Sequence, residues 1–461
     1  MRRESDFLGE VELPDCAYYG VQTARAVKNF PVSGIRESEE LIRGYVILKR
    51  AAAIVNRDVG ALDSERADAI VKACDALLRG EHLDQFPVDV FQAGAGTSVN
   101  MNVNEVLANL ALEYLGHEKG EYRFLHPNDH VNLGQSTNDT FTSACHIAVI
   151  LALPRLLGAL DNLAATFEAK SQEFGNVIKS GRTHLVDALP IMLGHEMGAY
   201  ASAVRRAMRR IDERGKDLYE LEVGGTAVGT GANAHPLFRQ KFFETIVRET
   251  KMPFHASPNS FESLETRAQL GAFMSSLKEL SVELIRICND LRLLASGPTT
   301  ALGEIALPAV QPGSSIMPGK VNPSMPECLT MIAYQVIGYD TSVTLASQGG
   351  QLELNIWTPL MIHDVMFSMK LYSNFVPIFT ERCVRGIVAN EERCSYHLTN
   401  NPILATFLAP RIGYARSAEL AEESEATGIP VPELAVKKGV ITDEESKEIF
   451  DPKEMARVHF S

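Results

Sequence analysis

The amino-acid sequence predicts a mainly α protein built around a bundle of long helices. The clearest observation is a heptad repeat, in which apolar side chains recur every three or four residues. Its members are Leu270, Phe273, Leu277, Leu280, Leu284, Ile287, Leu291 and Leu294. This spacing gives a helix one apolar stripe that packs against other helices. Gly297-Pro298 predicts the end of this helix. A low aromatic content of 7% also favours helices over strands.

Two further long helices are predicted in the middle of the chain. One runs from about residue 191 to 221, where Met197, Val204, Ile211 and Leu218 keep the seven-residue interval. The other runs from about residue 140 to 174, and Pro154 predicts a bend because proline lacks a backbone donor. Helices of about thirty residues are on the order of 45 Å long. They expose much apolar surface unless they pack on several others, so they indicate either a long bundle or association of subunits.

The regions on either side of these helices predict separate domains. Before them, segments such as "VELPDCAYYG" are broken by glycine and proline. After about Cys394, the sequence indicates short helices in a small unit. We therefore expect an N-terminal domain (1–137), a central long-helix domain (138–393) and a small C-terminal domain (394–461). No strong run of strands is predicted.

Composition and charge exclude several classes of protein. The 461 residues are 45% hydrophobic and 22% charged, as in a globular chain. The net charge of −14 and the lack of a basic run argue against a nucleic-acid partner. The seven cysteines lack metal-ligand spacing, so we expect reduced thiols. The N-terminus has no signal-like apolar region and the longest apolar run is too short to span a bilayer, which predicts a cytoplasmic protein without a membrane partner.

Four polar patches are candidates for a functional site. They read "GAGTSVNMNVNE" (94–105), "NDHVNLGQSTND" (128–139), "GRTHLVDALP" (181–190) and "GSSIMPGKVNP" (313–323). Taken singly, Thr97-Ser98 and Ser136-Thr137-Asn138 are typical helix caps, and His184 and Lys320 can be ordinary structural or solvated residues. Taken together, hydroxyls and free N–H groups at helix starts form sites that suit carboxylates.

The last patch is not a nucleotide-binding loop. Five residues separate Gly313 from Gly319, and Val321 follows Lys320 where a Walker A loop needs serine or threonine. A glycine-rich loop with a central lysine can instead fold over a small anion. At this point an anion-binding loop and an ordinary solvated lysine are both open for this segment.

The patches together resemble the aspartase/fumarase superfamily. "GSSIMPGKVNP" is similar to the shared motif of that family, and "GTSVNMNVNEV", "HPNDHVNLGQSTND", "GRTHLVDALP" and "GGTAVGTGAN" match its other blocks in order. The similarity extends from about Phe7 to the end of the chain. The resemblance implies a homotetramer whose central helices form a twenty-helix core, with each active site built from three subunits.

The resemblance also implies an anti-elimination that yields fumarate from a succinyl skeleton. A proton leaves the carbon next to a carboxylate, and the resulting charge spreads into that carboxylate as an aci form. Such a site needs preorganised donors and a base. By resemblance, Ser314 is the base, and Glu327 pairs with His184. Four residues hold the carboxylate that becomes the aci form: Thr97, Ser136, Thr137 and Ser315. Four others hold the second carboxylate: Thr183, His184, Lys320 and Asn322. Asn138 orients the leaving group, and no metal or organic cofactor is implied.

The sequence leaves the leaving group open. Two segments are more similar to aspartate ammonia-lyases and favour ammonia as the leaving group: "DQFPVDVFQAGAGTS" and "YYGVQTARA". Two others are more similar to fumarases: "HPNDHVN" and "GGTAVGTGANAHP". Three segments depart from the family pattern: Thr299-Thr300-Ala301 after Gly297-Pro298, Thr142 after Phe141, and Asn400-Asn401-Pro402. Alternatives are therefore a fumarate hydratase, a lyase that expels another amine, as ergothionase does, and a catalytically silent relative resembling lens crystallins.

Overall fold

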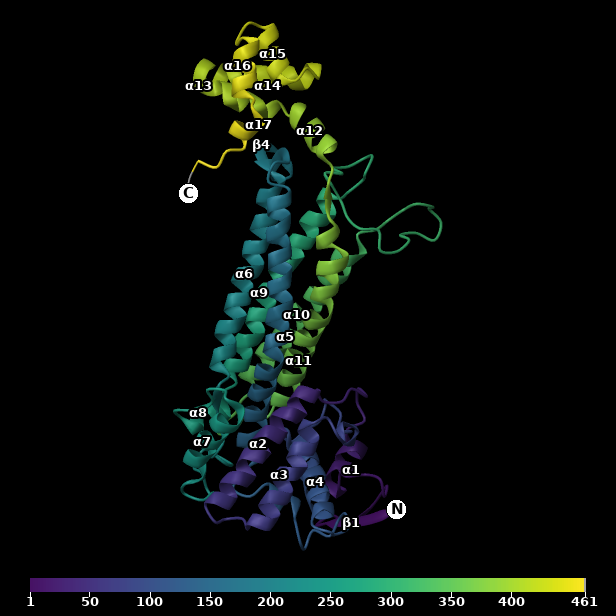
Figure 1. Ribbon diagram of the computed structural model, residues 1–461, viewed down its shortest axis with the longest axis vertical. Coiled ribbons are helices and arrows are strands. Elements are labelled where there is room, and N and C mark those ends of the chain that lie inside the picture. The colour runs from purple at the N-terminus through teal and green to yellow at the C-terminus, as the bar shows by residue number, and fades with distance from the viewer. Residues whose placement is uncertain (460–461) are drawn as a thin grey trace. The chain divides into compact units, whose positions relative to one another are not determined.

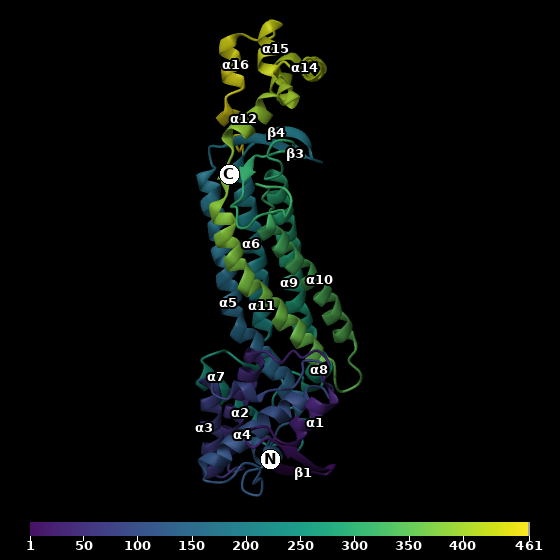
Figure 2. The ribbon, with the colours of Figure 1, turned by 90° about the vertical axis from the view of Figure 1, so that its right-hand side faces the viewer.

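The structure is a computed structural model that describes residues 1–459. It divides into two compact units, and five long helices contribute residues to both. These helices are α5 (Thr137–Glu173), α6 (Leu193–Asp217), α9 (Ala268–Leu294), α10 (Ser324–Gln348) and α11 (Thr358–Arg382). Within each unit they run side by side (Figures 1 and 2). The mainly α fold with a long-helix bundle is confirmed, whereas the three-domain division stays a prediction.

The predicted long helices are present, with small errors at their ends. All eight heptad residues of α9 are buried, which confirms the apolar stripe. The helix predicted from residue 191 begins at Leu193, because Ile191 belongs to a strand. Helix α5 continues through Pro154. It contains a window apolar enough to cross a membrane, but 67% of that window is buried inside the protein, which is typical of a core helix.

The first unit comprises Met1–Leu157, Arg209–Glu279 and Tyr334–Ser373. Besides its parts of the long helices, it contains β1 (Arg2–Asp6), β2 (Gly9–Leu13), α1 (Val21–Asn29), α2 (Glu39–Asp58), α3 (Ser64–Leu78), α4 (Thr97–Tyr114), β5 (Glu220–Leu221), α7 (Phe238–Thr250), β6 (His255–Ala256) and α8 (Ser260–Glu265). Helices α2 and α4 have 20 and 18 residues. The proline and glycine of "VELPDCAYYG" lie between β2 and α1 and interrupt neither helix.

The second unit comprises residues 158–208, 280–333 and those from 374 onward. It contains β3 (Ile178–Thr183), β4 (Val186–Met192), β7 (Ile305–Ala306), β8 (Val388–Ala389), α12 (Glu391–Thr399), α13 (Ala409–Ile412), α14 (Tyr414–Thr427), α15 (Val431–Lys437), α16 (Asp443–Ile449) and α17 (Pro452–Met455). The C-terminal helices are short, as predicted, and share an apolar cluster that includes Leu404, Leu420, Val431 and Leu434. Strands β3 and β4 form an antiparallel hairpin that the sequence did not predict.

Candidate active site

Two helix starts in the first unit carry the first group of candidate residues. Thr97 is the first residue of α4, and Ser136, Thr137 and Asn138 stand at the start of α5. Gly96 precedes α4 with φ of +93°, and a Cβ there would lie 2.1 Å from the Phe141 ring. The two helix starts can therefore approach closely only because residue 96 lacks a side chain.

The start of α5 is held by short-range hydrogen bonds. Asn138 N donates to Ser136 Oγ at 3.2 Å, and Ser136 N donates to Asp139 Oδ1 at 3.0 Å. The capping interpretation therefore fits Ser136. It does not fit Thr97, because the cap position of α4 is Gly96, which has no side chain to offer. The amide of Asn138 donates to Ala227 O at 2.7 Å, which ties this turn to the loop after β5.

Asp139 joins the start of α5 to the glycine-rich segment 224–233. Its carboxylate is 0% exposed and also accepts Gly224 N at 3.0 Å and Thr226 N at 2.9 Å. Burial raises the pKa of Asp139 to about 6, although the three backbone N–H bonds and nearby Lys49 act in the opposite direction. The segment "GGTAVGTGAN" therefore stabilises the start of α5.

Sequence reasoning missed the polar residues behind Thr137. Lys49, Asn100 and Asn132 are hydrogen-bonded to one another or to Thr137. One signal was available, because Lys49 interrupts the apolar run "YVILKRAAAIV". A lysine at such a position is buried and must have polar partners.

Thr183 and His184 lie on the tight turn between β3 and β4 in the second unit. His184 and Leu185 have φ of +57° and +61°, the left-handed conformation that a two-residue hairpin turn requires. Neither residue is a glycine or asparagine, so each costs about 1 to 2 kcal/mol of backbone strain. Both His184 and Thr183 are exposed. Strain of this kind concentrates at functional positions.

A buried ion cluster holds this hairpin in place. Glu304 is 0% exposed and lies 2.7 Å from Arg182 Nη2 and 3.2 Å from Lys179 Nζ. Burial opposes ionisation of Glu304, but the hydrogen bonds and charges of Arg182 and Lys179 outweigh it and lower the pKa of its carboxyl. Asn401 donates to Ser180 Oγ at 3.1 Å, so the departure from the family pattern at residues 400–402 supports the same hairpin.

The third group lies on the segment 313–323, between α9 and α10. This segment projects away from the helices at its ends (Figure 1, green). Ser314 Oγ accepts hydrogen bonds from Ile316 N at 3.2 Å and Met317 N at 3.0 Å. Hydrogen bonds donated to an oxygen favour its negatively charged form. The local geometry therefore suits a serine that acts as a base.

The same segment is closed on itself around Lys320. Gly313 N donates to Lys320 O at 2.8 Å, and Asn322 Nδ2 donates to Gly313 O at 2.7 Å. Lys320 Nζ donates to Asn322 Oδ1 at 2.8 Å. Three candidate residues, Ser314, Lys320 and Asn322, are thus brought together on one loop.

Ser315 and Glu327 complete the set. Ser315 is exposed on the loop, and Glu327 lies in the first turn of α10. Within residues 1–459, no hydrogen bond or ion pair joins Glu327 to His184, and their pairing stays a prediction. His126 Nδ1 accepts hydrogen bonds from Asn128 N and Asp129 N at 3.1 and 3.3 Å, so its side chain stabilises this turn.

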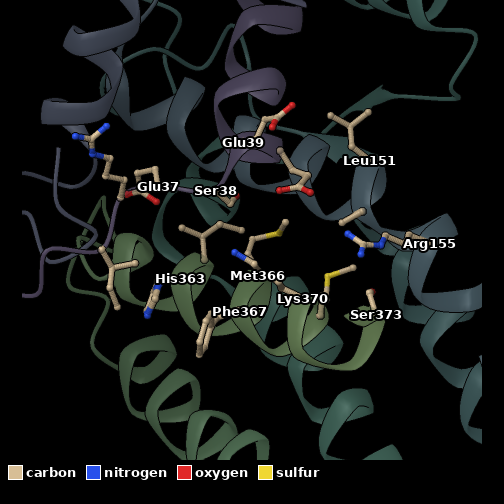
Figure 3. A pocket seen from close by; sticks show the side chains of 16 residues that line it. Glu37, Ser38, Glu39, Leu151, Arg155, His363, Met366, Phe367, Lys370 and Ser373 are labelled. Carbon is tan, nitrogen blue, oxygen red and sulfur yellow. The ribbon is translucent and has the colours of Figure 1, made fainter. Parts of the chain in front are cut away.

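A separate cavity of about 410 Å³ lies in the first unit, where the start of α2 faces α5 and α11. Figure 3 shows Glu37, Arg155 and Lys370 around it. Burial, and then the charge of Asp89, raises the pKa of Glu37 to about 8. None of the candidate residues lines this cavity.

Comparisons with known proteins find lyases of one superfamily that are similar over nearly the whole chain. A family model described as Lyase matches residues 9–338, and a second, described as Fumarase C C-terminus, matches residues 404–457. An aspartate ammonia-lyase of Bacillus sp is 46% identical over 99% of this chain and 97% of that protein. A class II fumarate hydratase of Methylorubrum extorquens is 44% identical over 98% of this chain and 96% of that protein.

A solved structure is similar over the same extent. The crystal structure of a fumarate lyase:delta crystallin from Brucella melitensis, bound to cobalt, has a TM-score of 0.97 and 45% sequence identity. The match covers 99% of this chain and 100% of that one.

Proposed function

The chain belongs to the lyase family of the aspartase/fumarase superfamily, and from this we propose that it is an aspartate ammonia-lyase. The reaction is the reversible elimination of ammonia from L-aspartate to give fumarate. The observation that supports an elimination catalyst is Ser314, whose Oγ accepts two backbone N–H bonds on an exposed loop. The choice of ammonia as the leaving group rests on the 46% identity to an aspartate ammonia-lyase.

Ser314 removes the proton from the carbon next to a carboxylate. A serine hydroxyl is a weak base unless its oxyanion is stabilised. The N–H groups of Ile316 and Met317 supply that stabilisation. The loop as a whole closes over the substrate, which excludes water and fixes the geometry of proton transfer.

Hydroxyl, amide, imidazole and ammonium groups hold the two carboxylates of the substrate. Four hydroxyls bind the carboxylate that gains charge: Thr97, Ser136, Thr137 and Ser315. The second carboxylate is held by Thr183, His184, Lys320 and Asn322. Glu327 sets the proton state of His184, and Asn138 orients the amine. Removing one good donor to such an oxyanion typically costs about 3 to 4 kcal/mol of transition-state stabilisation.

The test is an assay of the purified protein with two substrates and no added cofactor. We expect L-aspartate to release fumarate, followed by its ultraviolet absorbance, and ammonia, followed by a coupled enzyme. L-Malate should release little fumarate. Activity with neither acid would reject both substrates and favour a lyase that expels another amine.

Fumarate hydratase is the second candidate function. It is favoured by the C-terminal match to a fumarase model and by the 44% identity to a class II fumarate hydratase. A higher kcat/KM with L-malate than with L-aspartate would show that the protein is a fumarate hydratase.

The exposed face of α10 supports assembly into a homotetramer. Met331, Tyr334 and Leu345 are 64%, 59% and 58% exposed. They follow the three-and-four spacing of a helix seam, with Gly338 and Thr341 between them. This stripe contains no charged residue, and a solvated helix face of a single chain is normally charged. Further copies of the chain cover the stripe in the proposed assembly, so light scattering should give the mass of four chains.

A cytoplasmic location fits the cysteines. Each of the seven is a free thiol, and Cys74, Cys145, Cys288, Cys383 and Cys394 are buried. Reduced thiols are typical of the cytoplasm. The reaction as proposed uses side chains and backbone N–H groups of the protein alone.

A further inference from the structure

A buried polar chain lies behind the Thr137 hydroxyl and begins at Lys49. Lys49 is on α2 and is 0% exposed. Its Nζ lies 2.8 Å from Asn132 Oδ1 and 2.9 Å from Gln135 Oε1. Burial lowers the pKa of Lys49 to about 7, although nearby Asp139 acts in the opposite direction. Burying an amine in a helix core is costly, and packing alone would favour an apolar residue here.

The orientation of the Asn132 amide is fixed from both ends. Its Nδ2 donates to the backbone oxygen of Gln135 at 3.2 Å. A backbone carbonyl only accepts, so the nitrogen of the amide must face it and the oxygen must face Lys49. The amide of Asn132 therefore presents an acceptor to every group on that side.

Asn132 in turn fixes the amide of Asn100 on α4. Asn100 Nδ2 donates to Asn132 Oδ1 at 3.2 Å and to Thr137 Oγ1 at 2.9 Å. The other end of the same amide, Asn100 Oδ1, is buried and has no hydrogen-bond partner among residues 1–459. An unpaired buried acceptor is costly. In the observed orientation of this amide, the nitrogen donates to Thr137 although the oxygen is left unpaired.

The consequence concerns the proton of the Thr137 hydroxyl. A hydroxyl has one hydrogen to donate and can also accept. Because the Thr137 oxygen accepts from Asn100, its own O–H remains available as a donor. Thr137 is partly exposed at the start of α5, where the helix dipole also favours an anion.

We propose that Lys49, Asn132 and Asn100 are positioning residues that keep the Thr137 hydroxyl as a donor to the substrate carboxylate. None of the three touches the substrate. They exclude the competing arrangement, in which the hydroxyl would donate its proton to a buried amide oxygen. The proposal rests on the proposed function, because it requires an anionic substrate at Thr137.

Two isosteric substitutions separate positioning from simple burial. Both Asn100→Asp and Asn132→Asp replace an amide nitrogen by an oxygen and add one negative charge. In Asn132→Asp the acceptor that faces Lys49 and Asn100 is kept. In Asn100→Asp an acceptor faces Asn132 Oδ1 and draws the Thr137 proton inward. We expect kcat/KM to fall about 100-fold or more in Asn100→Asp, because this is the usual effect of losing one oxyanion donor. In Asn132→Asp we expect kcat/KM to fall by less than about tenfold.

A double-mutant cycle with Thr137→Val shows whether Asn100 acts through Thr137. Thr137→Val removes the hydroxyl, so Asn100→Asp should then cause almost no further loss of kcat/KM. Lys49→Met, expected to cost about tenfold as one of several groups acting on Asn132, should likewise lose its effect in the Thr137→Val protein. Circular dichroism and melting temperature identify variants that do not fold. If Asn100→Asp does not fold, the double-mutant cycle is measured with Lys49→Met and Thr137→Val.

Each outcome decides a different point. Multiplicative losses in the Thr137→Val background, or equal losses in Asn100→Asp and Asn132→Asp, would overturn the positioning role even if the wild type is a good aspartate ammonia-lyase. A wild type that converts neither aspartate nor malate would reject the proposed function. In that case the double-mutant cycle would be measured with the dissociation constant of succinate in place of kcat/KM. A wild type that fails to bind succinate would overturn the inference as well.

Discussion

The start of α5 and the loop 313–323 both carry candidate residues, but they are held in opposite ways. Around α5, the polar groups are buried and bonded to distant parts of the first unit, through Asp139 and Lys49. The loop is exposed, with Ile316 at 83%, and its bonds join residues of the loop itself. The start of α5 is therefore held rigidly, and the loop is suited to movement. Substitutions in the first region should therefore affect stability as well as activity, whereas substitutions in the loop should affect activity alone.

The largest expected effect is a loss of enzyme activity when Ser314 on the loop is changed. Ser314→Ala removes the proposed base, a contribution of about 10² to 10⁴ in rate, and leaves the N–H groups of Ile316 and Met317 without their acceptor. We expect turnover to fall about 10²- to 10⁴-fold with no change in melting temperature or assembly. Near-normal activity in this variant would reject Ser314 as the base.

At the start of α4, a single methyl group should destabilise the protein. In Gly96→Ala, the Cβ would lie 2.1 Å from Phe141 in addition to the strain of φ at +93°. We expect a loss of roughly 2 to 5 kcal/mol, the sum of left-handed strain and overpacking. Gly94→Ala is the matched control, because its φ is +96° but its nearest neighbour is 3.6 Å away. Thermal unfolding of both variants measures the difference, and equal melting temperatures would reject the clash.

The buried carboxylate of Asp139 should give stability a measurable pH dependence. Its pKa of about 6 lies above the ordinary value of 3.8. Between these values the folded state binds more protons than the unfolded state, so this group makes folding less favourable as pH rises from about 4 to 6. The effect is about 2 to 3 kcal/mol at most. We expect the melting temperature of the wild type to fall relative to Asp139→Asn over this range, and parallel curves would contradict the shift.

A smaller effect on activity alone is expected at Gly313. A Cβ there would lie 2.7 Å from Asn322 N and Lys320 O, so Gly313→Ala should open the loop closure. Misplacing reacting groups by about 1 Å can cost up to 10²-fold, and we expect about a tenfold loss in kcat/KM at constant melting temperature. Gln311→Ala, at an exposed neighbouring position, is the control. A drop in melting temperature for Gly313→Ala would show that the loop is part of the stable core.

Local patterns predicted the long helices and the superfamily, and both are confirmed. The heptad of α9 is visible in one stretch of sequence because every member points into the same core. The hairpin β3–β4 was missed, since its turn residues, His184 and Leu185, are poor formers of such turns. Strand β3 is instead held through Lys179 and Arg182 by Glu304, which is distant in sequence.

The candidate site was predicted only in part for the same reason. Motif residues such as Ser314 and Thr137 stand in recognisable blocks of sequence. Lys49 and Asn100 form hydrogen bonds that span 83 and 37 positions of the chain. A single sequence does not reveal such pairs, because each residue alone is compatible with an ordinary helix.

The uncharged stripe on α10 also affects how the protein behaves on dilution. If copies of the chain cover Met331, Tyr334 and Leu345, a lone chain presents these side chains to water and loses the free energy of their burial. Assembly then obeys mass action, so the fraction of complete particles falls as total protein falls. The specific activity of very dilute enzyme should decay with time and recover on concentration, which makes enzyme concentration a variable that every kinetic experiment on this protein must hold fixed.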